Sequence, residues 1–295
     1  MSVKGPEVSK HAPVVYETDV TDDQYQLIAP VIERRSKRGR PTTLCLRLVL
    51  NARLYLTRTG CQWRLLPKDF PAWQSVRYYF DQWTEDGTWL EINRLLVERR
   101  RMAVGRASTP SMGLIDSQSV KTTEVGGMRG IDGNKYVKGR KRQIATDTQG
   151  NLLGTLVHPA NTHDTVGGEE LLDLVLNEYP SIKKVLADQG YQGDLVAWFQ
   201  ADFGVVLEIV EKPADQKGFV VQKGRWVIER TIAWLNRCRR LSKDYERNAW
   251  NSEAMIYIAS IHLMLRQLLP NTNIPIPYKD KRLPESMGLT LNQAA

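Results

Sequence analysis

Apolar side chains recur every three or four positions through the first third of the chain, as they do on one face of a helix. Thr21 followed by Gln24 is a capping-box pattern, which predicts that a helix begins just after Thr21. Gly60 and Pro71 divide the pattern into several short helices. We therefore predict an all-α region over 21–101, arranged as a helix-turn-helix-like module or as a plain helical bundle, with most of its aromatic side chains in the core.

From residue 112 onward the pattern takes the period of strands. Residues 112–116 alternate between two faces and end at Asp116, and residues 184–188 form a buried strand that ends at Asp188. The other predicted elements are strands at 143–147 and 152–157 joined by a hairpin loop, helices at 171–176 and 194–201, a strand at 205–210 and a long helix at 223–242. This order predicts an α/β domain with a mixed sheet and flanking helices over 112–268.

The remaining segments have the composition of connections and chain ends. Gly, Ser, Thr and Pro interrupt the pattern over 102–111, which predicts a boundary there. Residues 1–20 are expected to form a flexible leader without the apolar block of a signal peptide, and 270–295, with four prolines, a C-terminal tail. The longest apolar stretch, 255–265, is about half of the roughly 20 residues that a membrane span needs. Three widely separated cysteines indicate neither a disulfide framework nor a zinc site, so we expect an intracellular protein.

Positive charge is concentrated in three parts of the chain. The 41 Lys and Arg against 33 Asp and Glu give a net charge of +8. Residues 34–64 hold nine basic side chains and no acid, 135–142 and 223–247 are also basic, and 161–215 is acidic. Three basic clusters together favour nucleic acid as a partner, although a solvated surface explains any single cluster equally well, and an edge strand protected by charge also explains the cluster at 138–142. The candidate contacts with double-stranded DNA are Arg34, Arg35, Lys37, Arg38, Arg40, Lys138, Arg140, Lys141, Arg142, Arg225, Arg237 and Arg240.

Three acids occupy positions where ligands gather in α/β proteins. Asp116 and Asp188 end predicted strands, and Glu229 lies in the first third of the last predicted helix. Taken singly, each has a structural explanation, as a turn cap or as a partner of Arg225. As an ordered set of hard oxygen ligands in a basic protein, they favour a catalytic site for Mg²⁺ or Mn²⁺.

The predicted helix at 223–242 places polar side chains on one stripe. At 3.6 residues per turn, Arg225, Glu229, Asn236 and Arg240 share a face beside an apolar one. The helix can therefore pack on the sheet and direct Glu229 along the sheet edge.

Five sequence blocks, spread over roughly residues 21–265, resemble the DDE transposases of bacterial insertion sequences, in particular the insertion-sequence-five type. The blocks are GCQWRLLPKDFPAWQSVRYYFDQW, GLIDSQSVK, GRKRQIATDTQGNLL, ADQGYQG and RWVIERTIAWLNRCRRLSKDYERN. The resemblance implies a ribonuclease-H-like catalytic domain behind a helical DNA-binding domain, with Asp116, Asp188 and Glu229 as a triad that holds two Mg²⁺ (or Mn²⁺) ions. It further implies cleavage and joining of DNA at the terminal inverted repeats of the element, by a homodimer or higher oligomer acting in the bacterial cytoplasm at the nucleoid.

The family also carries a Y-x2-R-x3-E-x6-K signature around the glutamate. This chain keeps Arg225 and Glu229 but has Gln222 in place of the Tyr and Asn236 in place of the Lys. The neighbouring Lys223 or Arg237 is available as a substitute phosphate contact.

Two other functions stay open on the sequence: a DNA-binding regulator without catalysis, and a structure-selective nuclease on the same fold. Ser117 and Ser119 beside Asp116 have no paired base, which argues against a serine recombinase. The pair His163–Asp164 either reaches the site as a secondary ligand or forms an Asx-type turn, and we leave it out of the predicted catalytic set.

Overall fold

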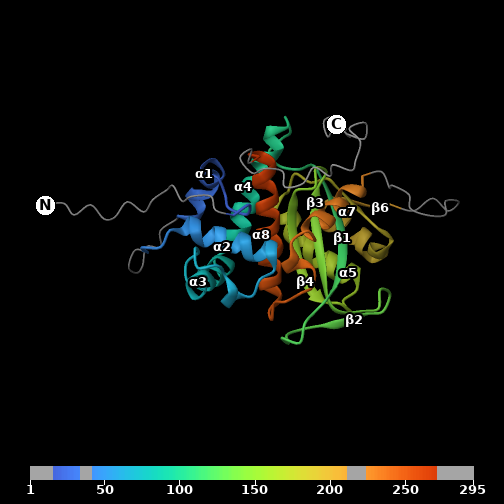
Figure 1. The fold of residues 1–295 in the computed structure, drawn as a ribbon. Coiled ribbons are helices and arrows are strands. Elements are labelled where there is room, and N and C mark those ends of the chain that lie inside the picture. Colours follow the sequence, from blue (N-terminus) through green and yellow to red (C-terminus); the bar gives the residue numbers. More distant parts are fainter. Residues whose placement is uncertain (1–15, 34–41, 211–223, 271–295) are drawn as a thin grey trace, which may run out of the picture.

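The computed structural model describes residues 16–33, 42–210 and 224–270, and Figure 1 shows their arrangement. Helices come first in the chain, as predicted: α1 (Asp22–Ile32), α2 (Leu46–Thr59), α3 (Trp73–Glu85) and α4 (Thr88–Ala103). The predicted capping box is present, because Gln24 N donates to Thr21 Oγ1 (3.2 Å) and Thr21 N donates to Gln24 Oε1 (3.0 Å). Phe80, Trp83 and Trp89 are buried, which confirms an aromatic core for this region.

A mixed sheet follows the helices. Its strands are β1 (Met112–Lys121), β2 (Gly130–Asp132), β3 (Val137–Asp147), β4 (Leu152–Pro159), β5 (Lys184–Ala187) and β6 (Val206–Ile209). β1 is antiparallel to β3 and parallel to β5, β6 is parallel to β5, and β4 and β2 both pair with the outer edge of β3. The helices of this part are α5 (Asp164–Glu178), α6 (Asp194–Phe203), α7 (Trp226–Leu235) and α8 (Ala249–Leu268).

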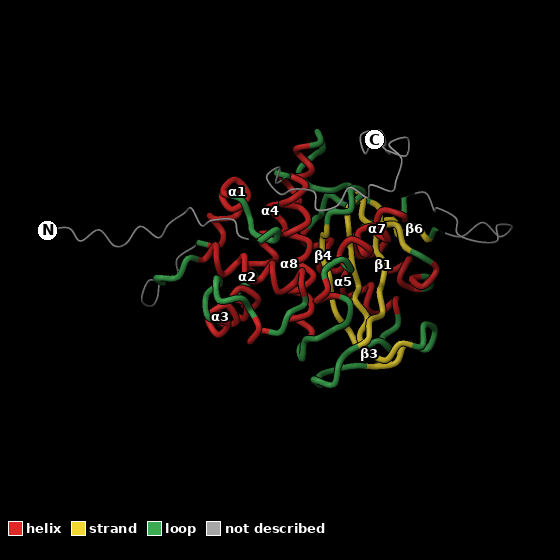
Figure 2. Tube along the Cα trace, in the orientation of Figure 1, coloured by secondary structure: helices red, strands yellow, loops and turns green. Residues whose placement is uncertain are grey.

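Helices pack on both faces of the sheet. Gly154 of β4 contacts α5 so closely that a Cβ there would lie 2.7 Å from Val175. Arg140 of β3 faces α8, where its guanidinium contacts Ser252. This arrangement confirms the predicted fold class, a ribonuclease-H-like α/β domain preceded by an all-α region (Figure 2).

Helix α8 lies between the helical region and the sheet (Figure 1), and it contacts α2, α4 and β4. Ser260 of α8 donates to Asn93 of α4 (3.0 Å), and Asn93 in turn donates to the carbonyl of Leu152 in β4 (2.7 Å). The apolar stretch 255–265 is buried because neighbours surround it on almost every side. No helix in the described part of the chain is long and apolar enough to cross a membrane.

Several predicted boundaries are wrong: β3 begins at Val137 and α5 at Asp164, both earlier than predicted, and two further differences bear on the site. β1 does not end at Asp116 but continues for five residues, because it keeps pairing with β3 as far as Lys121 opposite Gly139. The long helix predicted at 223–242 ends at Leu235, and a short 3₁₀ turn follows at Arg239–Leu241. The chain turns there because Leu241 is buried and its carbonyl accepts a hydrogen bond from Arg142 instead of continuing a helix (2.8 Å).

Candidate functional site

Two of the predicted acids lie at the same end of neighbouring parallel strands. Leu114 of β1 is opposite Leu186 of β5, and Asp116 and Asp188 each follow two residues later. Asp116 accepts a hydrogen bond from Ser117 N (2.7 Å), and Asp188 accepts one from Gly190 N (2.9 Å). Both carboxylates are thus held by backbone donors at the carboxyl end of the parallel pair, where α/β sheets bind ligands.

The first turn of α7 brings a guanidinium and the third acid to the same place. Nη2 of Arg225 lies 3.5 Å from Asp116 Oδ2, 3.6 Å from Asp188 Oδ2 and 3.8 Å from Glu229 Oε1. Gly224 allows this approach, because its φ is +90° and a Cβ there would lie 2.9 Å from Leu186 of β5. Three carboxylates from three separate elements therefore surround one nitrogen.

The site carries more negative than positive charge. Its three carboxylates face one guanidinium, and the exposed side-chain fractions are 14% for Asp116, 35% for Asp188 and 43% for Glu229. The pKa of Asp116 is raised to about 6, mainly by burial; the charge of Arg225 lowers it and the charge of Asp188 raises it. An additional cation would offset the cost of ionising Asp116 in this position.

The donor set suits a hard divalent cation, although the side chains are not arranged around one. Among the described residues, no three His, Cys, Asp or Glu side chains stand together as ready metal ligands. The contacts of Arg225 explain this, because its guanidinium lies among the three carboxylates. Asp116, Asp188 and Glu229 are the groups that would hold Mg²⁺ or Mn²⁺, since both ions prefer carboxylate oxygen.

A buried polar chain behind Asp188 was not predicted from the sequence. The hydroxyl of Tyr191 donates to Gln143 Oε1 (2.6 Å), Gln143 Nε2 donates to Asp164 Oδ1 (3.3 Å), and Lys141 Nζ lies 3.0 Å from the same oxygen. Burial raises the pKa of Tyr191 well above its ordinary value, as do three nearby aspartates. Gln143 and Lys141 alternate on β3 toward one face, which is the only signal in the sequence for this chain.

His163 and Asp164 have different roles: the first caps a helix, and the second approaches the carboxylate site. His163 caps α5, since its ring Nδ1 accepts from Thr165 N (3.4 Å). Asp164 approaches the site: a Cβ on Gly190 would lie 3.1 Å from its Oδ2 and 3.0 Å from Asp188 Oδ1. The two carboxylates therefore flank the same glycine.

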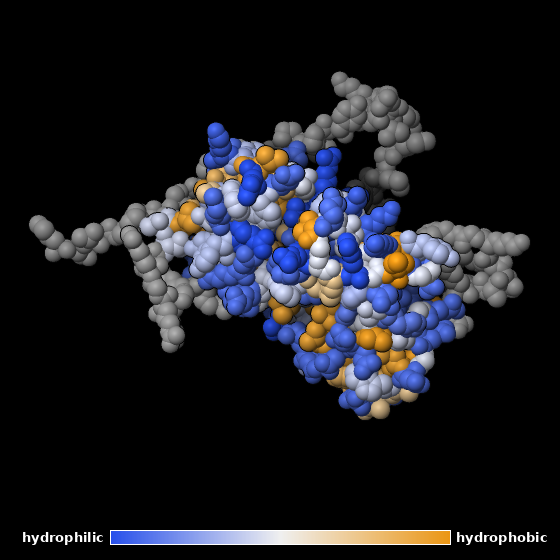
Figure 3. Space-filling model, turned by 90° about the horizontal axis from the view of Figure 1, so that it is seen from below, coloured by the Kyte–Doolittle hydropathy of each residue, from blue (hydrophilic) through white to orange (hydrophobic). Residues whose placement is uncertain are grey.

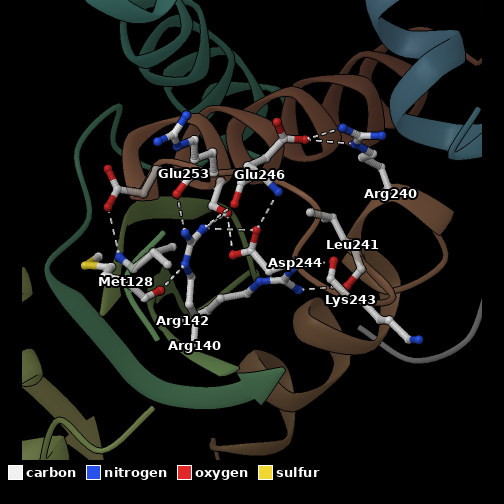
Figure 4. Close-up of polar contacts among 12 residues, drawn as sticks. Met128, Arg140, Arg142, Arg240, Leu241, Lys243, Asp244, Glu246 and Glu253 are labelled. Carbon is white, nitrogen blue, oxygen red and sulfur yellow. Dashed lines mark hydrogen bonds and ion pairs between the residues drawn. The ribbon is translucent and has the colours of Figure 1, made fainter. Parts of the chain in front are cut away.

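Three predicted DNA contacts are instead internal. Arg140 is 0% exposed, lies 3.2 Å from Asp244, and donates to the carbonyls of Met128, Glu246 and Arg247 (Figure 4). Arg142 is buried against the carbonyls of Leu241 and Lys243, and Lys141 is buried against Asp164. Because their charged groups are engaged inside the protein, we remove Arg140, Lys141 and Arg142 from the predicted DNA interface.

The other predicted contacts have different positions. Arg240 is mostly buried and pairs with Glu246 (2.7 Å), so it does not share a stripe with Glu229 as predicted. Arg225 belongs to the carboxylate site, whereas Lys138 and Arg237 are exposed. Arg34, Arg35, Lys37, Arg38 and Arg40 lie outside the described residues.

Part of the basic stretch at 34–64 is also internal. The Arg53 guanidinium lies 4.1 Å from the ring centre of Phe80 and 4.4 Å from that of Trp63, and Arg47 is buried against Asp22. Hydrophilic side chains cover most of the face in Figure 3, with separate hydrophobic patches between them. The charge available to a polyanion is therefore smaller than the sequence count indicates.

Two family models and a known relative match this chain. The family Transposase DDE domain matches residues 107–264, and a family of IS4/5 transposases matches 20–93. A transposase for insertion sequence element IS402 of Burkholderia cepacia is 33% identical over 118 residues. The matched region covers 38% of this chain and about half (56%) of the length of that relative. The crystal structure of the Mos1 mariner paired end complex with Mn is similar over 85% of this chain and 87% of that chain, with 10% identity and a low TM-score of 0.28.

Proposed function

The chain belongs to the DDE transposase family, and on that premise we propose that it binds the ends of an insertion sequence and cleaves and joins DNA by metal-dependent phosphoryl transfer. One observation carries the proposal: carboxylates from β1, the end of β5 and α7 surround a single guanidinium. Excess negative charge at a sheet end, in a chain of net charge +8, suits a site that takes cations together with a polyanion.

Asp116, Asp188 and Glu229 would hold one or two Mg²⁺ or Mn²⁺ ions, which when bound activate water and offset charge on the scissile phosphate. Backbone donors at Ser117 and Gly190 fix the orientation of the two aspartates. Arg225 keeps the three carboxylates together, and its planar guanidinium is suited to a phosphate oxygen once cations balance the acids. This combination of positioning and charge neutralisation needs no side-chain nucleophile.

The proposed partners are the terminal inverted repeats of the element and target DNA, held by a homodimer or higher oligomer in the cytoplasm at the nucleoid. The five basic residues from Arg34 to Arg40, together with the exposed Lys138 and Arg237, are the proposed phosphate contacts in addition to Arg225. Such contacts act through charge and therefore weaken with salt.

The test compares Asp188→Asn with Asp202→Asn, which changes an exposed acid on α6 in the same way. The asparagine oxygen can still accept from Gly190 N, but the charge that holds a hard cation is gone. We expect Asp188→Asn to slow Mg²⁺-dependent cleavage of a labelled duplex carrying the terminal repeat by about 100-fold or more, while gel-shift binding and thermal melting stay near those of Asp202→Asn. Cleavage at the wild-type rate by folded Asp188→Asn protein would overturn the proposed metal-dependent site, whereas binding without cleavage by the wild-type protein would favour the DNA-binding regulator.

A further inference from the structure

The sheet extends past the carboxylate site as a curled hairpin. β1 continues beyond Asp116 to Lys121, and later in the chain β2 and β3 form an antiparallel hairpin joined by residues 133–136 (Figure 1). Two contacts show that the hairpin folds back along β1: Ser119 Oγ donates to Asp132 Oδ2 (2.5 Å), and Lys135 Nζ donates to the carbonyl of Ser117 (3.4 Å). The turn at 133–136 thus carries a side chain that reaches the residue after Asp116.

Internal contacts fix the conformation of this turn. The buried carboxylate of Asp132 accepts from the backbone N–H groups of Asn134 and Lys135, both at 3.0 Å. Tyr136 has a φ of +52°, in the left-handed region that non-glycine residues seldom adopt, and its side chain is 87% exposed. A turn held this way presents Lys135 in a defined place rather than as a free surface side chain.

Lys135 keeps most of its donor capacity. Its ammonium has three N–H donors, and its one hydrogen bond, to Ser117 O, is long. Within the described residues Lys135 is exposed and forms no ion pair, whereas Arg225 is shared among three carboxylates. The hydrogen bond to Ser117 O places its ammonium next to the residue that follows Asp116.

We propose that Lys135 binds a DNA phosphate beside the one that reacts, and so positions the strand over Asp116, Asp188 and Glu229. The inference rests on the proposed function. A lysine ammonium binds phosphate as a compact point charge, and here it lies next to the residue that follows Asp116, in a site with excess negative charge. Lys135 is therefore a positioning residue of the reaction and not a metal ligand.

The test uses the full chain and single-turnover cleavage of a duplex that carries the terminal repeat. Lys135→Gln removes the charge, Lys135→Arg keeps it, and Lys183→Gln is the matched control. Lys183 is also exposed and also donates to a backbone carbonyl at 3.4 Å, but it lies next to the start of β5, at the opposite end of that strand from Asp188. We expect Lys135→Gln to slow cleavage about tenfold, Lys135→Arg to retain most of the rate, and Lys183→Gln to match wild type.

A second measurement separates phosphate binding from a structural role. Single neutral methylphosphonates are placed, one at a time, at the phosphates around the cleavage point. At one position the substitution should slow the wild-type protein but not slow Lys135→Gln further, and Lys135→Gln should lower the log–log salt slope of binding by about 0.9. Methylphosphonate effects that are the same in both proteins at every position would overturn the inference, as would equal rates for Lys135→Gln and Lys183→Gln.

Asp188→Asn in the same assay keeps the two proposals apart. If Asp188→Asn cleaves like wild type, the proposed function fails, and the role of Lys135 fails with it. If Asp188→Asn is inactive while Lys135→Gln is fully active, the proposed function stands and only the role of Lys135 is overturned.

Discussion

Two clusters in this protein are built from arginines and carboxylates, and they differ in how those groups are paired. The first, which we call the arginine cluster, consists of Arg140, Arg142, Arg240, Asp244 and Glu246 (Figure 4). All five are largely buried, and each arginine is bound at 2.7–3.2 Å by a carboxylate or at 2.8–2.9 Å by a backbone carbonyl. The second is the carboxylate site around Arg225, where the distances are 3.5–3.8 Å.

The difference separates a structural role from a functional one. In the arginine cluster, carboxylates and backbone carbonyls bind all three guanidiniums inside the protein, although Nε of Arg142 has no partner among the described residues, so little remains for an outside partner. In the carboxylate site three acids share one cation, the distances are long, and two of the acids are substantially exposed. Residue type alone does not distinguish the two clusters; the shorter contacts and deeper burial of the arginine cluster do.

The largest expected effect is a loss of stability when an arginine of the arginine cluster is replaced by an uncharged residue. Arg140→Met should lower the free energy of unfolding by about 3–5 kcal/mol, because Asp244 and the carbonyls of Glu246 and Arg247 would be left buried without their donor. Urea denaturation of the variant and the wild-type protein measures this difference in the free energy of unfolding. A decrease below about 1 kcal/mol would show that the cluster contributes little to stability.

The same kind of change at the carboxylate site should leave the fold intact. Asp116→Asn should slow metal-dependent cleavage by about 100-fold or more, with a melting temperature equal to or above that of wild type, because ionising this buried group costs stability. Cleavage assays and thermal melting are run on the same preparation. Loss of both together would place Asp116 with the arginine cluster as a structural residue.

Glu253 of α8 lies beside the arginine cluster but forms no ion pair in the described part of the chain. It therefore tests how an unpaired buried acid affects stability. Its carboxyl accepts from Val157 N (2.9 Å), and burial raises its pKa from 4.5 to about 7. The folded protein therefore holds this proton more tightly than the unfolded chain, and stability falls as pH rises from about 4.5 to about 7. Glu253→Gln should be more stable than wild type by about 1–3 kcal/mol at pH 8 and gain nothing at pH 4.5.

That difference is measured by denaturation of both proteins across the pH range. An identical pH dependence for Glu253→Gln and wild type would mean that Glu253 is already ionised in the folded protein.

The smallest expected effect concerns the exposed basic residues. Replacing Lys138 and Arg237 with Gln should lower the log–log salt slope of duplex binding by about 0.9 for each phosphate that is no longer neutralised, while stability changes by less than about 0.5 kcal/mol. Gel shifts at several salt concentrations measure the slope. An unchanged slope would place both side chains away from DNA.

Local signals were readable from the sequence where neighbours in the chain decide the structure. The Thr21–Gln24 capping box and the hairpin between β3 and β4 formed as predicted, because side chains and turns within a few residues specify them. Asp116 did not end its strand, since a distant partner strand sets the length of β1.

The roles of the charged residues were harder to predict, because charge does not reveal burial. Arg140 and Arg142 have the sequence pattern of a basic edge strand, yet helix α8 and the segment before it cover them. The three acids were found from their order and spacing, whereas Lys135 comes near them only through the curl of the hairpin. Such proximity depends on tertiary structure, and no local pattern encodes it.

The position of α8 has a consequence for how the chain is made. A ribosome delivers α1 to α4 first, but their apolar faces are covered only when α8 emerges, more than 140 residues after α4 ends. Gln24 illustrates the dependence, since its side chain donates to the carbonyl of Leu269, just past the end of α8 (2.7 Å). A product cut short before residue 249 would leave apolar surface exposed on α2 and α4.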